Sequence, residues 1–261
     1  MLRILNRAFA AETRGYVVCS NPRSGSTYLG FLAKSTGKLG VPCEWLRGDG
    51  GAASLDYENY TQDESEQVHY VLTDGKTPNG VYGLKMFPEH FDMRTETCWA
   101  ESLPQLHYVH LVREDIIGQA ISLAIARQTG SYVKETPESH EAVYDRTLIL
   151  NCLRFIAAGE ARWRMFFAIN KIRPLEITYS RLLENPQREI SRIAEVVGVR
   201  NAKINRSKFL PTPQRTLRND LWRKRFTADL HDVRELPRLG IPTLRDTILQ
   251  DDVVMKKSGC A

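Results

Sequence analysis

Cysteine, long apolar runs and a leader pattern are scarce or absent in this chain of 261 residues. Its five cysteines are an odd number with no close pairs, so neither a disulfide framework nor a Cys-x-x-Cys metal motif is indicated. No stretch is apolar enough to span a membrane, and arginines interrupt the apolar residues at the start of the chain, unlike a signal peptide. We therefore expect a cytoplasmic protein with no metal and no transmembrane segment. The cysteines are Cys19, Cys43, Cys98, Cys152 and Cys260.

Neither sign of charge dominates the sequence. The 36 basic residues exceed the 31 acidic ones by enough to give a net charge of +5. Such a mild excess suits an anionic ligand but does not require nucleic acid as a partner. The hydrophobic share of 42% and the charged share of 26% are those of a globular protein, and the length suits one large core. We expect a single domain over residues 1–261.

Short apolar segments, each bounded by glycine, proline or charge, alternate with helical patterns along the chain. This alternation predicts an α/β fold with a central parallel sheet flanked by helices. Residues 47–75 are expected to form a mobile loop or lid, although the composition of 47–67 also fits a short solvated helix, and residues 227–261 are expected to form a C-terminal extension. The expected strands are Tyr16–Cys19, Val81–Phe87, His107–Val112 and Leu175–Tyr179. The expected helices run from Ser26 to a C-cap at Gly37, from Asp115 to Gln128, and from an N-cap at Thr136, with Pro137 at N1, to Ile169.

The first strand leads into a small-residue turn that carries one arginine, and then into a helix. Asn21 and Pro22 turn the chain, and Gly25 permits a close approach of the backbone. The amides of the helix N-terminus would then point toward an anion, so the turn Arg23-Ser24-Gly25-Ser26-Thr27 predicts a phosphate cradle. Similar Gly-Ser turns also precede helices that bind nothing, so this reading needs support from a second site.

The glycine spacing of an NTP-hydrolysing P-loop, Gly-x-x-x-x-Gly-Lys-Ser/Thr, is absent here. Arg23 lies within the turn, so a guanidinium replaces the lysine ammonium. The segment Pro-Arg-Ser-Gly-Ser-Thr resembles the 5'-phosphosulfate loop of sulfotransferases, whose fold is P-loop-like and whose donor is 3'-phosphoadenosine 5'-phosphosulfate (PAPS). The resemblance implies that Arg23, Ser24, Gly25, Ser26 and Thr27 hold the 5'-phosphate and the sulfuryl group, with Arg23 also acting in catalysis.

A second candidate anion site follows the strand that ends at Val112. Arg113 stands at the carboxyl edge of this strand, and Ser122 lies on the next helix. Ligands of open α/β sheets bind at that edge. In sulfotransferases an arginine and a serine at these places hold the 3'-phosphate of PAPS, and Arg113 and Ser122 match them. By themselves they also fit a surface arginine and an ordinary helix serine.

Two downstream motifs resemble the trehalose 2-sulfotransferase family: Gly40-Val-Pro-Cys-Glu-Trp-Leu and Lys76-Thr-Pro-Asn-Gly-Val-Tyr-Gly-Leu-Lys-Met. The resemblance implies that Glu44 is the catalytic base, which takes the proton from an acceptor hydroxyl. It also implies a carbohydrate or glycolipid acceptor and a possible homodimer. Trp45 and Leu46 replace two phenylalanines of the family motif, so trehalose is one acceptor among several.

Other residues compete for roles in this site. Other sulfotransferases use a histidine base, so His90 and His110 are alternatives to Glu44. Lys85 ends its strand and could stabilise charge on the bridging oxygen, or could be an ordinary edge lysine. In sulfotransferases a late basic loop closes over the 3'-phosphate, which makes Arg215 and Arg218 candidates; the later basic run at 223–225 is expected to be a solvated helix face.

Two other functions compete with a PAPS-dependent carbohydrate sulfotransferase that acts by direct in-line transfer. One is an NTP-dependent kinase with a degenerate P-loop, although Val112-Arg113 stands where a magnesium site would have an aspartate. The other is a non-enzymatic protein that binds nucleotides or nucleic acid through its arginines, and it would need no Glu44.

Overall fold

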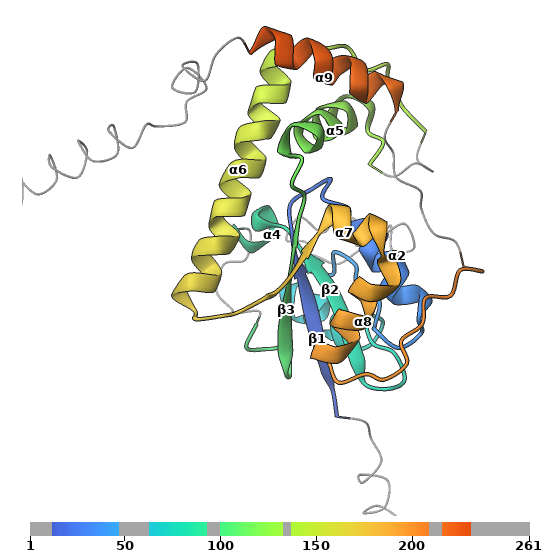
Figure 1. The fold of residues 1–261 in the computed structure, drawn as a ribbon. Coiled ribbons are helices and arrows are strands. Elements are labelled where there is room, and N and C mark those ends of the chain that lie inside the picture. Colours follow the sequence, from blue (N-terminus) through green and yellow to red (C-terminus); the bar gives the residue numbers. More distant parts are fainter. Residues whose placement is uncertain (1–11, 47–62, 93–99, 133–136, 209–215, 231–261) are drawn as a thin grey trace, which may run out of the picture.

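A parallel sheet of four strands forms the centre of the computed structural model, which describes residues 12–46, 63–92, 100–132, 137–208 and 216–230 (Figure 1). The strand order is β2-β1-β3-β4, and β1 pairs in parallel with both β2 and β3. The predicted fold class is therefore confirmed, and each predicted strand is found within two residues of its expected ends. The strands are β1 Arg14–Cys19, β2 Val81–Met86, β3 Leu106–Val112 and β4 Leu175–Thr178.

Helices cover both faces of the sheet because the strands are apolar on both sides, as is usual for buried parallel strands. On one face, α2, α7 and α8 pack through Leu29, Leu182 and Ile190. On the other face, α6 packs through Trp163 and Phe167 (Figure 1). The described helices are α2 Ser26–Ser35, α3 Glu64–Leu72, α4 Pro88–Asp92, α5 Ile116–Thr129, α6 Arg146–Ile169, α7 Tyr179–Glu184, α8 Pro186–Val196 and α9 Leu217–Asp229.

Beyond the carboxyl ends of the strands, α5, the first half of α6 and α9 form a separate apolar cluster, with Phe226 and Ile121 fully buried (Figure 1). No helix among the described residues is long and apolar enough to cross a membrane. The described elements all belong to one α/β unit. A single domain over the whole of residues 1–261 stays a prediction.

The predicted start of the third helix is wrong. The helix begins at Arg146, where the Asp145 side chain accepts a hydrogen bond from the Leu148 amide, and not near Pro137. Residues 137–145 form a loop because hydrogen bonds to α5 hold them in place. The Gln128 side chain bonds to both the backbone N–H and the carbonyl of Val143, and Ser139 Oγ donates to the Thr129 carbonyl. Thr136 lies outside the described residues.

Helices occupy parts of the expected loop or lid and of the expected C-terminal extension. Within the expected loop or lid at 47–75, residues from 64 on form α3, which Asp63 caps at its start and which buries Val71. The extension expected from residue 227 overlaps α9, which continues to Asp229 and buries Phe226. Residues 47–62 and 231–261 lie outside the described part of the chain. The predicted first helix is confirmed: it begins at Ser26, and Gly37, with φ of 64°, follows its end.

Candidate functional site

The predicted cradle connects β1 to α2 by a tight turn with two residues in the left-handed region. Arg23 has φ of 63° and Gly25 has φ of 94°. A Cβ at Gly25 would lie 2.5 Å from the ring of Tyr179, so this position needs glycine both for its backbone angle and for space. The Leu29 amide donates to the Gly25 carbonyl, so α2 starts directly at the turn and directs its N-terminal amides there.

Arg113, which follows β3, and Gln119 of α5 hold the cradle from one side. Gln119 Nε2 donates to the Pro22 carbonyl over 2.8 Å, and Arg113 Nη1 donates to the Arg23 carbonyl over 3.0 Å. In return, Arg23 Nε donates to Ser122 Oγ over 2.9 Å, and Arg23 Nη1 donates to the Tyr132 carbonyl. The residues of the two predicted anion sites are therefore in direct contact with each other.

The electrostatics of the cradle favour an anion. Burial and the nearby positive charge of Arg113 lower the pKa of Arg23 to about 10, although Tyr132 and Tyr179 act in the opposite direction. The Arg113 guanidinium lies over the Tyr179 ring, 5.0 Å from its centre. Ser24 Oγ is buried and has no hydrogen-bond partner among the described residues. A bound anion would offset the adjacent positive charges and could bond to this hydroxyl.

Glu44 returns to the cradle because the chain reverses after α2. Gly37 and Gly40 both have positive φ, and Pro42 then packs so closely on α2 that a Cβ at Gly30 would lie 2.8 Å from the Pro42 carbonyl oxygen. The next residue, Cys43, forms a parallel bridge with Leu84 of β2, and its carbonyl accepts from the Lys85 amide. This short pairing holds Glu44 beside the carboxyl end of β2.

The side chains that meet there form an ion pair on the cradle. Lys85 Nζ lies 2.9 Å from Glu44 Oε1 and donates to Thr27 Oγ1 of the cradle over 3.1 Å. His90 Nε2, on α4, lies 3.8 Å from Glu44 Oε2. Glu44 is 16% exposed and Lys85 is 9% exposed, so both side chains are largely shielded from water. The structure thus brings together the predicted base, the predicted lysine and the predicted cradle.

His110 occupies a different environment. Its Nε2 lies 3.3 Å from Glu160 Oε2 on α6, and its ring packs against Phe167. Burial alone would raise the pKa of Glu160, but the contacts with His110 and Arg164 outweigh it and lower the pKa. These partners suit a structural role for His110.

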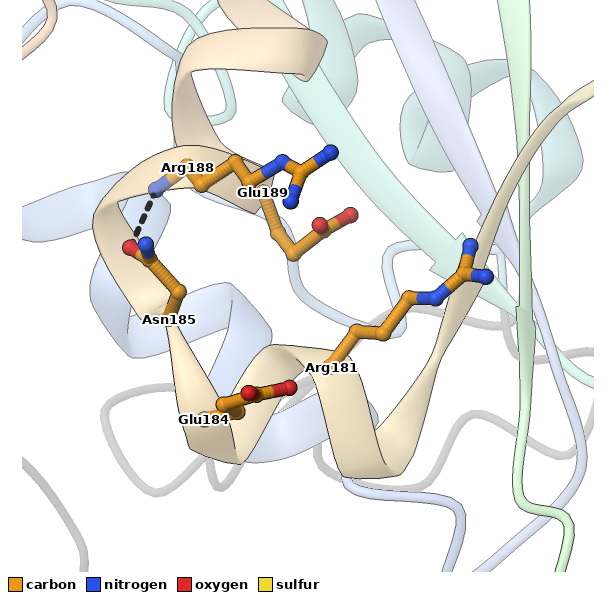
Figure 2. Close-up of a pocket in the computed structure, with 5 residues that line it drawn as sticks. All are labelled: Arg181, Glu184, Asn185, Arg188 and Glu189. Carbon is orange, nitrogen blue, oxygen red and sulfur yellow. Dashed lines mark hydrogen bonds between the residues drawn. The ribbon is translucent and has the colours of Figure 1, made fainter.

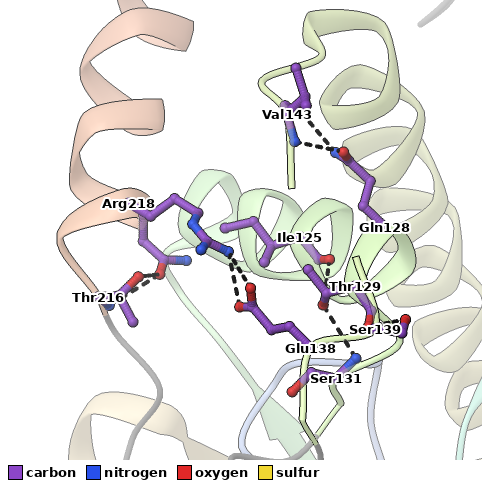
Figure 3. A network of polar contacts seen from close by, with 10 residues as sticks. Ile125, Gln128, Thr129, Ser131, Glu138, Ser139, Val143, Thr216 and Arg218 are labelled. Carbon is purple, nitrogen blue, oxygen red and sulfur yellow. Dashed lines mark hydrogen bonds and ion pairs between the residues drawn. The ribbon is translucent and has the colours of Figure 1, made fainter. Parts of the chain in front are cut away.

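Arg218, one of the two late arginines, bonds to Glu138 in the described part of the chain. Figure 3 shows Arg218 of α9 directed at Glu138, and its Nη1 lies 2.9 and 3.1 Å from the two carboxylate oxygens. Arg215 lies outside the described residues. The donor-binding role of both arginines stays a prediction. The basic run at 223–225 is only partly the solvated face that we expected: Arg223 pairs with Asp115 over 2.5 Å, and Arg225 lies over the Tyr144 ring.

Sequence reasoning missed two residues that build the cradle, Gln119 and Tyr179. Gln119 stands three residues before Ser122 on the same helix face, and a polar residue buried to 2% exposure on a helix points to a specific partner. Tyr179 was expected only as the end of the fourth strand, and it packs against Gly25 and Arg113 at the cradle.

A pocket of about 350 Å³ lies elsewhere, at the junction of α7 and α8 (Figure 2). Its lining mixes both signs of charge and contains no residue of the predicted site. Glu189, in this lining, is bound by Arg192 over 2.6 Å. The lining residues are Arg181, Glu184, Asn185, Arg188 and Glu189.

Comparison with known proteins matches residues 15–229 to the family described as Stf0 sulphotransferase. A curated relative from Mycobacterium tuberculosis (strain ATCC 35801 / TMC 107 / Erdman), trehalose 2-sulfotransferase, is 28% identical and aligns 88% of this chain with 98% of its own. The protein of the same name from Mycolicibacterium smegmatis (strain ATCC 700084 / mc(2)155) is 23% identical, with 82% and 94% aligned. Among solved structures, the sulfotransferase domain from the curacin biosynthetic pathway has a TM-score of 0.44 at 14% identity, covering 84% of this chain and 97% of that one.

Proposed function

Because the chain belongs to the Stf0 sulphotransferase family and is thus a sulfotransferase, we propose that it transfers a sulfuryl group from PAPS to a hydroxyl of a sugar or glycolipid. One observation carries the proposal: Glu44, Lys85 and Thr27 form a chain of contacts of 2.9 and 3.1 Å that joins a candidate base to the anion cradle. The names of the curated relatives support a sugar acceptor. The cytoplasmic location and the homodimer stay predictions.

The donor would occupy the adjacent anion sites. The cradle residues would hold its 5'-phosphosulfate, since this group needs backbone amides, a hydroxyl and a guanidinium fork. Arg113 and Ser122 would hold the 3'-phosphate. The hydrogen bonds of Arg23 with Ser122 and of Arg113 with the cradle backbone support this assignment, because they join the residues proposed for the two ends of the donor. The cradle residues are Arg23, Ser24, Gly25, Ser26 and Thr27.

The acceptor hydroxyl would react beside Glu44. Its oxygen forms the new bond to sulfur, the bond from sulfur to the bridging phosphate oxygen breaks, and Glu44 takes the proton. The bound donor supplies the sulfuryl group and leaves as adenosine 3',5'-bisphosphate (PAP). Lys85, already hydrogen-bonded to Thr27, is suited to stabilise charge on the bridging oxygen.

Labelled PAPS offered with a panel of sugars and glycolipids tests the function directly. We expect label to appear on a carbohydrate hydroxyl. In a parallel thermal-shift experiment, PAP should raise Tm more than Mg-ATP does, because ATP lacks the 3'-phosphate. A Tm increase with Mg-ATP alone would favour the kinase. Binding of polyanions with a steep salt dependence, and no transfer to any acceptor, would favour the non-enzymatic reading.

Gly25→Ala should weaken PAP binding about tenfold or more, because the backbone angle is costly for alanine and the Cβ would collide with Tyr179. Gly37→Ala is a matched control. Gly37 also has positive φ, but nothing lies within 4 Å of its Cβ position. It should lower the free energy of unfolding by about 1 kcal/mol and leave PAP binding unchanged. Calorimetric titration and thermal unfolding measure both effects, and equal loss of PAP binding in the two variants would contradict the assignment of the cradle.

A further inference from the structure

We propose that His90 is a positioning residue, which acts on the reaction by fixing the orientation of the Glu44 carboxylate. This inference rests on the proposed function, in which Glu44 is the base. The two oxygens of Glu44 face different partners: Oε1 lies 2.9 Å from Lys85 Nζ, and Oε2 lies 3.8 Å from His90 Nε2. The distance from His90 Nε2 to Glu44 Oε2 is within the range of an ion pair but longer than a hydrogen bond. A small movement of either side chain would therefore form the hydrogen bond.

The His90 ring is held in place by packing and by the position of its short helix. Helix α4 begins two residues after β2 ends, and the His90 amide donates to the Phe87 carbonyl over 3.1 Å. The ring packs on Phe87 with 5.2 Å between ring centres, and its side chain is only 6% exposed. Pro88 in turn packs on α6, since a Cβ at Gly159 would lie 3.1 Å from Pro88 Cγ. A group supported in this way can determine how a neighbouring carboxylate is turned.

Lys85 alone does not determine this orientation. Its Nζ is shared with Thr27 Oγ1, and in the proposed reaction it also serves the bridging oxygen. The Lys85 contact holds Oε1, and a contact at Oε2 restrains rotation about the end of the glutamate side chain. His90 would therefore act through Glu44 and need not touch the substrate.

The test is a pair of substitutions at position 90. His90→Phe keeps a ring to pack on Phe87 and removes the polar edge; His90→Gln keeps an N–H at a similar reach. With PAPS and whichever sugar of the panel is sulfated, His90→Phe should lower kcat about 10- to 100-fold, because small displacements of a reacting group have effects of this size. The KM for PAPS and the PAP dissociation constant should stay unchanged, and His90→Gln should recover most of the kcat. An unaltered kcat in His90→Phe, or no recovery in His90→Gln, would overturn the proposal.

A double variant separates this role from that of an independent base. In the Glu44→Gln background, His90→Phe should have no further effect on kcat if it acts only through the Glu44 carboxylate. A further loss of the single variant's full size would show that His90 acts by itself. If Glu44→Gln keeps wild-type turnover, Glu44 is not the base. That result would contradict the proposed function and not only the role of His90. A crystal structure of His90→Phe gives a readout without activity: the Glu44 carboxylate should adopt more than one rotamer, and a single unchanged rotamer contradicts the inference.

Discussion

Glu44→Gln should lower turnover by about 10²- to 10⁴-fold, the range associated with loss of a general base. The amide keeps the size and shape of the side chain but cannot take the acceptor's proton. Its oxygen can still accept a hydrogen bond from Lys85, so the contact of Lys85 with Thr27 should persist and the cradle should keep its shape. We therefore expect PAP to bind the variant as tightly as it binds the wild type. Steady-state kinetics and titration calorimetry measure these two quantities separately.

Glu160→Gln is a suitable control for this substitution. Glu160 has similar partners, with a histidine at 3.3 Å and a basic side chain at 2.9 Å, but it lies on α6 and pairs with His110. The control should lose some stability, since its ion pairs are weakened, and should keep its turnover. Wild-type turnover in Glu44→Gln would remove Glu44 from the mechanism. Comparable losses of turnover in both variants would mean that general electrostatics around the sheet, and not one base, control the rate.

Arg113→Ala should weaken the binding of PAP by about ten- to a hundredfold or more, because each charge-assisted hydrogen bond to a phosphate contributes about 1.5 to 3 kcal/mol. The same variant should bind AMP, which lacks the 3'-phosphate, with a smaller loss. Some loss for AMP is expected, since Arg113 Nη1 also donates to the Arg23 carbonyl and thereby supports the cradle. The ratio of the two losses isolates the contribution of the 3'-phosphate.

Arg223→Ala is the matched control for Arg113→Ala. Arg223 pairs with Asp115, which stands two residues after Arg113 in the sequence. The Arg223 side chain is 40% exposed. Its removal should leave the affinities for PAP and AMP unchanged. Titration of both ligands into both variants decides the question. If Arg113→Ala loses the same factor for PAP as for AMP, Arg113 supports the loop without binding the 3'-phosphate.

The sheet and the tight turn between β1 and α2 could be predicted from the sequence because local signals determine them. The strands are short apolar runs with clear boundaries, and the turn around Gly25 has the composition of an anion-binding loop. The relation of Ser122 to the cradle was less clear in sequence, but Gln119 and Ser122 lie three residues apart on one helix face and both contact the cradle.

Contacts between distant segments could not be predicted in the same way. Pro137 is a good local signal for a helix start, yet long-range hydrogen bonds from Gln128 keep the following residues in a loop. The return of Glu44 depends on the close approach of Pro42 to Gly30 and on the parallel bridge of Cys43 with Leu84. The hydrophobic periodicity of the sequence does not indicate contacts between segments so far apart. The family resemblance identified Glu44, and the chain geometry then explains how it reaches the cradle.

The strand order fixes the spacing between the residues of the candidate site. Three neighbouring strands each end in one part of it: β2 ends with Lys85 and Met86, β1 leads into the cradle, and Arg113 follows β3. Neighbouring strands lie about 4.8 Å apart, so the backbones that carry Lys85 and Arg113 are separated by roughly 10 Å of hydrogen-bonded main chain. The sheet therefore fixes the distance between Lys85 and Arg113, which the proposed function assigns to the acceptor end and to the 3'-phosphate. Substitutions in the surrounding helices can thus change how stable the protein is without changing that length.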